Sequence, residues 1–400
     1  MKVQILTIGK FHFFHLARQL DKFKKLERIY SGYPNKFIKK EKNISKKISL
    51  FNFSFYSIIF IILYTLKKID IAGLKNIENY LSILIYKPIF NNFKKHIKSK
   101  SILITNSGFG LESAIEIKKT KGLFICDRGA AHIKYQDKIL RKEHSKHKVL
   151  YNKITSNIIK REIEEYNLAD LISVPSTFVK RTFIQYGIDK KKLFLNPYGV
   201  EKKTFYFKGK KIDKNKEFNI LFVGNVTLQK GIFYLLDAFT NINFVNKKLT
   251  IIGPIDTLLK KKISKYKSSK ITFIKKVEHQ KLIDFYSNSD VFVLPSIQDG
   301  FGMVITEALA CGCPVIATEN TGARDIFQNN KAGFIIKPMS SKLISNKINL
   351  LIKDPILRKK MSNEALNTIK NINGWNKYGE RWNDKIDSII TDYKKINKSS

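Results

Sequence analysis

The sequence predicts an α/β protein built from two Rossmann-like domains with parallel sheets. Short and almost continuously apolar runs recur along the chain, and segments with helical periodicity separate them. Strands of this kind are buried on both faces, which is typical of parallel sheets covered by helices. The pattern fills both halves of the 400 residues, a length that suits two domains of roughly 100–200 residues each.

The expected strands form two groups on either side of a lysine-rich linker at Lys202–Glu217. An amphipathic helix at Trp375–Tyr393 closes the chain, and we expect it to pack back on the first domain. The domains are therefore predicted at 1–205 and 206–375, with the closing helix at 376–400. The expected strands are Val3–Ile8, Ser101–Thr105, Leu123–Cys126, Leu171–Val174 and Leu193–Asn196, then Asn219–Val223, Leu249–Ile252, Ile271–Ile274, Val291–Leu294, Val315–Ala317 and Phe334–Ile336.

Composition excludes several classes of protein. Lysine and arginine number 74 against 33 acids, a net charge of +41, yet 43% of the residues are apolar, so the chain is not a disordered polycation. Three cysteines without a CxxC pair exclude a disulfide framework and a thiolate zinc cage, and favour the cytoplasm. Only nine of the basic residues are arginines. Nucleic acid is therefore not expected as a partner, because base and phosphate readers rely on arginine; an anionic membrane surface or a phosphorylated ligand fits better.

For one segment, the sequence does not decide between a protein core and a membrane. Residues 48–66 carry no charge, and lysine pairs flank them. The run barely reaches the ~20 residues of a spanning helix and contains five Ser, Thr or Asn residues, so three interpretations remain: a buried helix, a segment in the membrane interface, and a span. The surrounding residues 35–100 hold 14 lysines and three acids, which fits docking on the inner face of an anionic membrane. The N-terminus lacks the features of a signal peptide.

A first candidate site follows the first strand of the second domain. The sequence Leu221–Ile232 reads as an apolar strand, a glycine at Gly224, a polar turn with Asn225, and a helix opened by Lys230 and Gly231. Free N–H groups at a helix start favour an anion, and the lysine adds a full charge there. An ordinary strand–helix turn with a surface lysine is the alternative.

A second and more specific candidate spans Val291–Thr318. A buried strand leads to a loop with Asp299 and Gly302, and Glu307 lies in the helix that follows. Both acids are expected at the crevice beyond the carboxyl end of the strand. Carboxylates accept sugar hydroxyls, while the helix-start N–H groups of Met303 and Val304 suit a phosphate. The alternative is an acid placed at the helix dipole and an incidental glutamate.

A third set of polar residues follows two strands of the first domain. Gly9 and His12 lie in the segment Gly9–His15, and Asp127, Arg128 and His132 lie in Cys126–His132. A metal site would need recognisable ligand spacing. The histidines, His144 and His147 included, do not supply it, and no metal and no cofactor are expected.

The two second-domain stretches together resemble the family 4 retaining glycosyltransferases, and the likeness extends over most of the chain. The segments "LADLISVPSTFVKRTFIQYGIDKKKLFLNPYGVEKKTF" and "DVFVLPSIQDGFGMVITEALACGCPVIATENTG" carry it most clearly. The resemblance implies the GT-B fold, in which the two parallel sheets face a central cleft, with the donor in the second domain and the acceptor in the first.

The resemblance also implies roles for individual residues. Glu307 would bind the ribose and Asp299 would orient the donor sugar, while Lys230 would bind the diphosphate. Gly9 would face the diphosphate and the acceptor. The family usually has glutamate at the position of Asp299 and arginine at that of Asn225. Asp127 and His132 are predicted as catalytic, together with Asp299 and Lys230. His12 and Arg128 are expected on the acceptor side, where Arg128 would replace the charge missing at Asn225. The residues expected at the nucleotide sugar also include Gly224, Asn225, Gly302, Met303 and Val304.

The sequence thus predicts a retaining glycosyltransferase of hexosyltransferase type. It would move a sugar from a UDP-, GDP- or ADP-sugar to a saccharide or lipid-linked acceptor in surface polysaccharide or lipopolysaccharide biosynthesis. Two rivals stay open: a GT-B-shaped nucleotide-sugar enzyme of another reaction type, and a basic membrane- or nucleic-acid-binding protein without catalysis.

Overall fold

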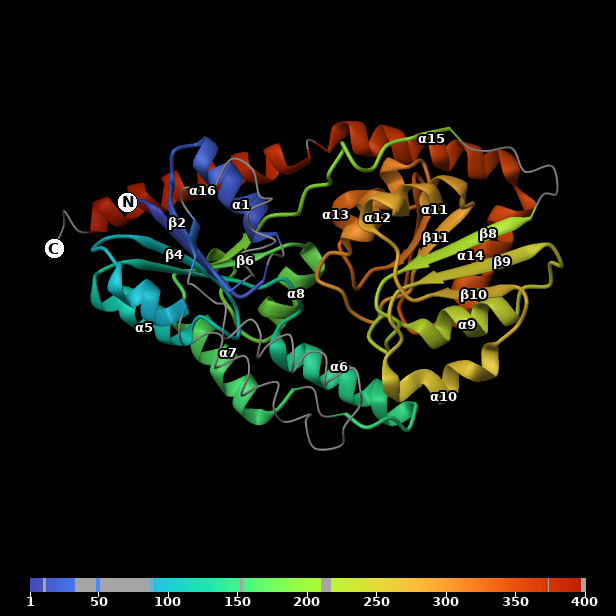
Figure 1. The fold of residues 1–400 in the computed structure, drawn as a ribbon, viewed down its shortest axis with the longest axis horizontal. Coiled ribbons are helices and arrows are strands. Elements are labelled where there is room, and N and C mark those ends of the chain that lie inside the picture. Colours follow the sequence, from blue (N-terminus) through green and yellow to red (C-terminus); the bar gives the residue numbers. More distant parts are fainter. Residues whose placement is uncertain are drawn as a thin grey trace.

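Two parallel β-sheets flanked by helices make up the chain (Figure 1). The computed structural model describes residues 1–9, 12–32, 48–50, 87, 89–151, 154–209, 217–372 and 374–396. The first sheet has the strand order β3-β2-β1-β4-β5-β6-β7, and the second β10-β9-β8-β11-β12-β13. In both sheets the order reverses beside the first strand of the domain, which creates the crevice where open α/β sheets bind ligands.

The first sheet and its helices build the first domain. Its strands are β1 (Val3–Thr7), β2 (Leu26–Ser31), β3 (Ile48–Leu50), β4 (Ile102–Asn106), β5 (Leu123–Asp127), β6 (Leu171–Val174) and β7 (Leu193–Leu195). Its helices are α1 (Phe13–Lys22), α5 (Leu111–Lys119), α6 (Ile133–Lys146), α7 (Ser156–Leu168) and α8 (Thr177–Gln185).

The second sheet and its helices build the second domain. Its strands are β8 (Phe218–Val223), β9 (Lys247–Ile252), β10 (Ile271–Ile274), β11 (Val291–Leu294), β12 (Val315–Thr318) and β13 (Gly333–Ile336). Its helices are α9 (Ile232–Thr240), α10 (Lys260–Ile263), α11 (Leu282–Asn288), α12 (Met303–Ala310), α13 (Ala323–Ile326), α14 (Ser341–Lys353) and α15 (Pro355–Asn371).

Every expected strand is present within one or two residues of its predicted ends, but two strands of the first sheet were not expected. Strand β2 contains Glu27 and Arg28, which interrupt its apolar run. Strand β3 lies at the start of the uncharged run 48–66, where a buried helix or a membrane segment was expected. Residues 48–50 instead pair in parallel with β2 at the edge of the sheet. Residues 51–66 of that run lie outside the described part of the chain.

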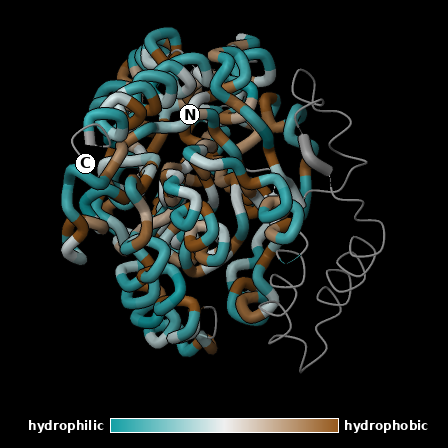
Figure 2. Tube along the Cα trace, turned by 90° about the vertical axis from the view of Figure 1, so that its left-hand side faces the viewer, coloured by the Kyte–Doolittle hydropathy of each residue, from teal (hydrophilic) through white to brown (hydrophobic). Residues whose placement is uncertain are grey.

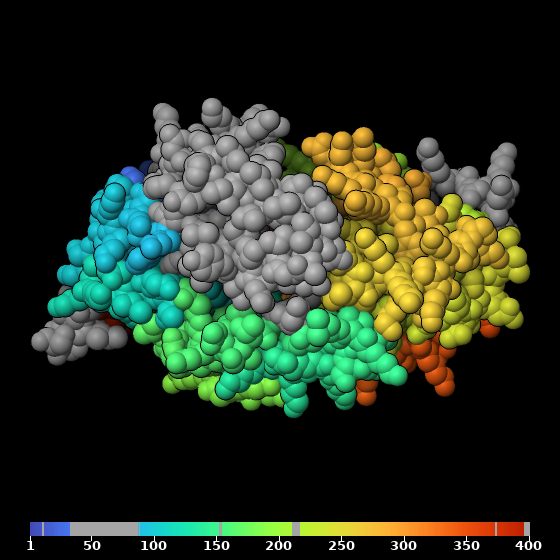
Figure 3. Space-filling view, turned by 60° about the horizontal axis from the view of Figure 1, so that its bottom comes forward, coloured from blue at the N-terminus to red at the C-terminus, as the bar shows by residue number. Residues whose placement is uncertain are grey.

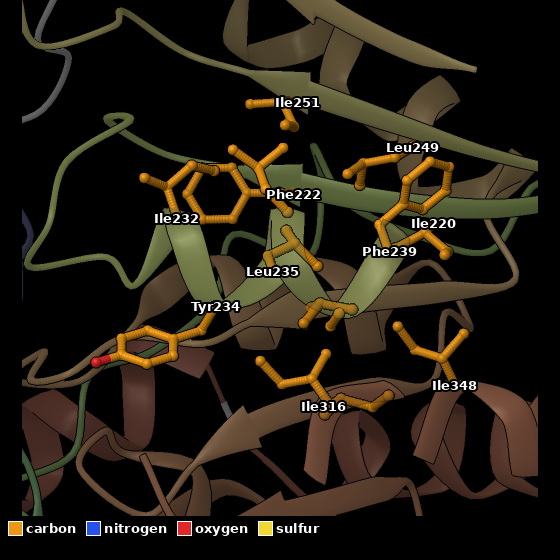
Figure 4. Close-up of a cluster of buried hydrophobic side chains, with 14 of the residues drawn as sticks. Ile220, Phe222, Ile232, Tyr234, Leu235, Phe239, Leu249, Ile251, Ile316 and Ile348 are labelled. Carbon is orange, nitrogen blue, oxygen red and sulfur yellow. The ribbon is translucent and has the colours of Figure 1, made fainter. Parts of the chain in front are cut away.

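The second domain packs an apolar core on each face of its sheet, because its strands are buried almost throughout. On one face α9 lies over β8 and β9 with Phe222, Leu235 and Ile251 fully buried (Figure 4). Tyr234 at the start of α9 points its phenol oxygen away from this cluster (Figure 4). Hydrophilic segments predominate around the outside of the molecule (Figure 2).

The last helix, α16 (Gly374–Ile396), returns from the second domain and lies along α1 of the first (Figure 1). Trp382 and Ile386 of α16 are buried in one core with Phe13 and Leu16 of α1. The chain therefore crosses between the domains twice, once after β7 and once before α16. Within the described residues, no helix is both long and apolar enough to cross a membrane.

A second bridge joins the domains on the side of α6. In the space-filling view, the residues around 130–150 extend beneath the second domain and meet its residues around 230–270 (Figure 3). There Tyr234 donates to Glu143 over 3.0 Å and accepts from Lys146 over 2.9 Å. His147 stacks on Phe233, with ring centroids 4.9 Å apart. These contacts tie α6 to the first turn of α9.

Candidate functional site

The loop between β8 and α9 is packed tightly against the loop after β11. Gly231, at the N-cap of α9, has a φ of 69°, and a Cβ there would lie 2.0 Å from the carbonyl oxygen of Pro295. Only glycine fits both the left-handed conformation and this approach. Lys230 precedes it, so the backbone fixes where this lysine leaves the loop. Gly224 directly follows β8, and the next residue, Asn225, is exposed.

Lys230 and Asp299, both predicted for the site, form an ion pair between these two loops. Their side chains are 23% and 17% exposed, so ligands can still reach them. The Asp299 backbone N–H donates to the Asn320 carbonyl over 2.8 Å, which anchors the loop to the end of β12. A bound anion would compete with Asp299 for the lysine, so the pair holds the lysine in place before a ligand arrives.

Helix α12 begins beside this pair without a side-chain cap. Gly302, its N-cap, has a φ of 77° and offers no side-chain acceptor. The N–H groups of the first turn, which include those of Met303 and Val304, have no partner within a helix and carry the positive end of its dipole. Met303 is 37% exposed and Val304 is partly exposed, so this helix end is accessible. The arrangement suits an anion.

Glu307 lies one turn into α12 and has partners of its own. One carboxylate oxygen accepts from the buried Tyr286 hydroxyl over 3.0 Å, and the other lies 3.2 Å from His279 Nε2. Burial, followed by the Glu307 charge, raises the pKa of Tyr286 well above its usual value, so this hydroxyl remains a donor. The Glu307 side chain is 8% exposed and that of His279 62%. The two acids of the motif therefore have different partners, Lys230 for one and Tyr286 with His279 for the other.

In the first domain, His12 and Asp127 come together at the carboxyl ends of β1 and β5. His12 Nε2 lies 3.1 Å from Asp127 Oδ1, outside hydrogen-bond geometry, and both side chains are buried. The His12 ring stacks on Tyr198, with centroids 4.5 Å apart. The Gly9 carbonyl accepts from Thr7 Oγ1 over 2.8 Å; the next two residues of this loop lie outside the described chain.

Arg128 is used inside the first domain and does not replace the charge missing at Asn225, contrary to the expectation. It is 9% exposed. Its guanidinium donates to Ser107 and Glu162 over 3.0 Å each, to Gln136 over 2.7 Å and to the Ala131 carbonyl over 3.2 Å. A sequence motif cannot reveal this, because Glu162 comes from α7, far along the chain.

His132 is a helix cap. Its Nδ1 accepts from the Lys134 N–H at the start of α6, and its ring stacks on Tyr186 with centroids 4.6 Å apart. Burial, with the Arg128 charge second, lowers the pKa of His132 to about 3, so the ring is neutral near pH 7. His132 therefore serves as the neutral cap at the start of α6.

The loops that carry Asp127 and Asp299 touch each other. A Cβ built on Gly300 would lie 1.7 Å from the Gly129 carbonyl oxygen, so these backbones meet at two glycines. Ser176 Oγ donates to the Gly300 carbonyl over 2.6 Å. Close by, the Asp325 carboxylate accepts from the Thr177 N–H at the start of α8. The candidate site is thus composed of both domains.

Three residues of this site were not predicted. Tyr286 and His279 support Glu307, and Tyr198 packs on His12. Tyr198 lies within a segment already singled out and Tyr286 shortly before another, whereas His279 carries no such signal. Among the described residues, no group of three or more His, Cys, Asp or Glu side chains could hold a metal ion. His144 contacts the Leu150 carbonyl, and His147 contacts Glu143.

The chain resembles known proteins in part of its sequence and in its fold. Residues 203–368 match the family model of the glycosyl transferases group 1. The chain is 34% identical over 185 residues to the capsular polysaccharide biosynthesis glycosyltransferase CapM of Staphylococcus aureus, covering 43% of this chain and 48% of that one. The alignment thus spans about half the length of that relative.

A second relative is the N,N'-diacetylbacillosaminyl-diphospho-undecaprenol alpha-1,3-N-acetylgalactosaminyltransferase of Campylobacter jejuni, which is 26% identical over 179 residues, 45% of this chain and 46% of that one. Among solved structures, Anabaena HepE in complex with UDP-glucose superposes with a TM-score of 0.68 at 15% identity, over 97% of this chain and 100% of that one. This similarity shows the fold over nearly the whole chain, and the fold is GT-B, as predicted.

Proposed function

We propose that the chain is a retaining glycosyltransferase that uses a nucleotide diphosphate sugar, because residues 203–368 match the family model of the glycosyl transferases group 1. The acceptor is a saccharide or a lipid-linked saccharide of surface polysaccharide biosynthesis. The names of the S. aureus and C. jejuni relatives support this class of acceptor. The observation that carries the proposal is the Lys230–Asp299 pair beside the uncapped start of α12.

In the proposed reaction, the bond between the anomeric carbon and the diphosphate oxygen breaks, and the diphosphate leaves with the electron pair. The acceptor hydroxyl oxygen forms the new bond from the same face, and its proton passes to the leaving diphosphate. Negative charge therefore grows on the diphosphate while positive charge grows on the sugar. Lys230 and the α12 N–H groups stabilise the first charge more in the transition state than in the ground state. Asp299 orients the sugar and lies beside the positive charge that grows on it.

Glu307 is proposed to accept the ribose hydroxyls. Tyr286 fixes one of its oxygens from the buried side, and the other points toward the exposed His279. A buried site built to bond hydroxyls discriminates strongly against ligands that lack them. The nucleotide would thus be held at two points, the ribose and the diphosphate, before the sugar is positioned.

Retention and donor identity are tested together. We would incubate the protein with UDP-, GDP- and ADP-sugars and short saccharide acceptors, and follow the released nucleoside diphosphate. NMR of the product would give the anomeric configuration. Transfer with the configuration retained supports the proposal; an inverted product contradicts the mechanism, and release from no donor contradicts the function.

Association with the inner face of the membrane belongs to the same proposal. A net charge of +41 and the lysine-rich residues 35–100 favour anionic lipid, at about 1 kcal/mol per lysine close to the surface. A lipid-linked acceptor would be met there. We expect the protein to sediment with anionic vesicles but not with neutral ones, and high salt should reverse this. Salt screens the attraction between the lysines and the anionic head groups, within about 8 Å at physiological ionic strength.

A further inference from the structure

Tyr198 lies at the point where the two domains meet. It follows β7 on the segment that leaves the first domain, and α16 holds this segment from the other side. Arg381 of α16 donates to the Asn196 side chain and to the Pro197 carbonyl, over 2.6 Å each. The backbone of Gly199 packs against Gly374, where the chain returns. The residues on both sides of Tyr198 are therefore fixed.

Aromatic neighbours from three parts of the molecule fix the ring itself. It stacks on His12 of the first domain, with centroids 4.5 Å apart and planes at 27°. It meets Phe301 of the second domain edge-on at 5.3 Å. Trp375 and Tyr378 of α16 lie 6.3 and 6.0 Å away. A ring held from this many sides presents its hydroxyl at a defined position.

That position is the junction of the two loops that carry Asp127 and Asp299. A Cβ on Gly129 would lie 3.2 Å from the Tyr198 hydroxyl oxygen, and Gly129 is the residue that touches Gly300. Burial raises the pKa of Tyr198 well above its usual value, and Asp127, Tyr378 and Asp299 add to this shift. The hydroxyl is therefore protonated, and it lies at Gly129, where the loop of Asp127 meets the loop of Asp299.

We propose that Tyr198 is a further substrate-positioning residue, whose hydroxyl binds a saccharide hydroxyl at the junction of the Asp127 and Asp299 loops. This assignment rests on the proposed function. A protonated phenol can donate to a sugar oxygen and accept from a sugar hydroxyl at once, which neither carboxylate can do when ionised. Since the residue lies where the loops of the two domains meet, it would position the saccharide only when the domains are together.

The test uses Tyr198→Phe, which keeps the ring and its stacking on His12 and removes only the oxygen. With the donor identified from the panel, we expect kcat to fall about tenfold, while the Kd of the bare nucleoside diphosphate stays within twofold of the wild-type value. Tyr151→Phe is the matched control: its hydroxyl donates to Asp137 over 3.1 Å within the first domain, and its loss should leave transfer unchanged.

Hydrolysis of the donor without acceptor separates the two saccharides that Tyr198 could bind. If it binds the transferred sugar, Tyr198→Phe slows hydrolysis as much as transfer; if it binds the acceptor, hydrolysis is unchanged and the acceptor KM rises. Wild-type kinetics in the variant overturn the assignment, as does a nucleotide affinity that falls as much as the rate, because that pattern indicates a structural role. A wild-type protein that transfers from no donor overturns the proposed function, and this assignment with it.

Discussion

Helices begin at the cleft in both domains, but α5 and α6 of the first domain begin differently from α9 and α12 of the second. In the first domain, the Glu165 carboxyl group fills the start of α5, accepting from the N–H groups of Gly108, Gly110 and Leu111 over 2.5, 2.9 and 3.0 Å. His132 caps α6. In the second domain, α9 and α12 begin at left-handed glycines without a side-chain cap.

The difference teaches where an anion can bind. Both α5 and α12 follow a parallel strand and a glycine-containing loop, so their sequences suggest the same site. The protein's own carboxyl group satisfies the α5 donors, whereas no side chain caps α12 at Gly302. The Lys230–Asp299 pair lies in the loops that precede α9 and α12. Burial raises the pKa of Glu165 to about 8, so the filled site is largely neutral near pH 7. This supports the proposal that the diphosphate binds in the second domain.

The largest expected effect comes from emptying the filled site. Glu165→Ala should lower the free energy of unfolding by roughly 3–5 kcal/mol, because it leaves one buried and two partly buried N–H groups without this acceptor. Urea denaturation measures this. Glu112→Ala is the control, since the Glu112 side chain is 43% exposed and pairs with Arg161, and surface pairs contribute below ~1 kcal/mol. Similar losses of stability in both variants would show that the N–H groups at the start of α5 do not need Glu165 as their acceptor.

Next in size is the effect of Lys230 at the open site. Lys230→Ala should lower kcat/KM by about 10- to 100-fold, because charge-assisted hydrogen bonds contribute roughly 1.5–3 kcal/mol. The fold should persist, as circular dichroism can verify. Lys331→Ala is the control. Lys331 is exposed and precedes β13, so it lies at the amino ends of the strands, opposite the candidate site, and its loss should leave the rate unchanged. An unchanged rate in Lys230→Ala would remove the contrast between the two domains.

A pH titration of stability tests the cap at α6. Because the pKa of His132 is lowered to about 3 in the folded chain, the unfolded chain binds the extra proton below pH 6.5. Stability is therefore lost as the pH falls from about 6.5 toward 3, by about 2 kcal/mol between pH 6.5 and 5.

His132→Asn keeps an acceptor for the α6 N–H but does not titrate, so it should weaken this dependence. His96→Asn, at an exposed histidine, serves as the control. If wild type and His132→Asn lose stability in parallel on acidification, His132 is not held neutral by burial.

The sequence predicts the secondary-structure elements of this protein better than it predicts which side chains contact one another. The eleven expected strands could be predicted because strands of a buried parallel sheet are apolar along most of their length. Strand β2 is missed because Glu27 lies within it, where it binds Gln4 and Lys98. The cleft loops of the second domain follow from local patterns of glycine, lysine and acid. By contrast, Arg128 and His132 look equally reactive in sequence, and only Glu162 and Tyr186, brought in by tertiary structure, show that they are internal.

The smallest expected effect separates the two acids beside the open helix. Glu307→Gln should weaken binding of a bare nucleoside diphosphate about fivefold to tenfold, because a carboxylate that accepts hydroxyls is replaced by an amide that keeps its place on Tyr286. Asp299→Asn should leave that affinity nearly unchanged and lower kcat, since Asp299 is assigned to the sugar, which the bare nucleotide lacks. Loss of charge at Asp299 also frees Lys230 for the diphosphate, so nucleotide affinity could rise but should not fall. Calorimetry with UDP, GDP and ADP, combined with turnover on the matching sugars, measures both quantities. Equal losses of nucleotide affinity in the two variants would contradict the division, because both acids would then act on the nucleotide at the start of α12.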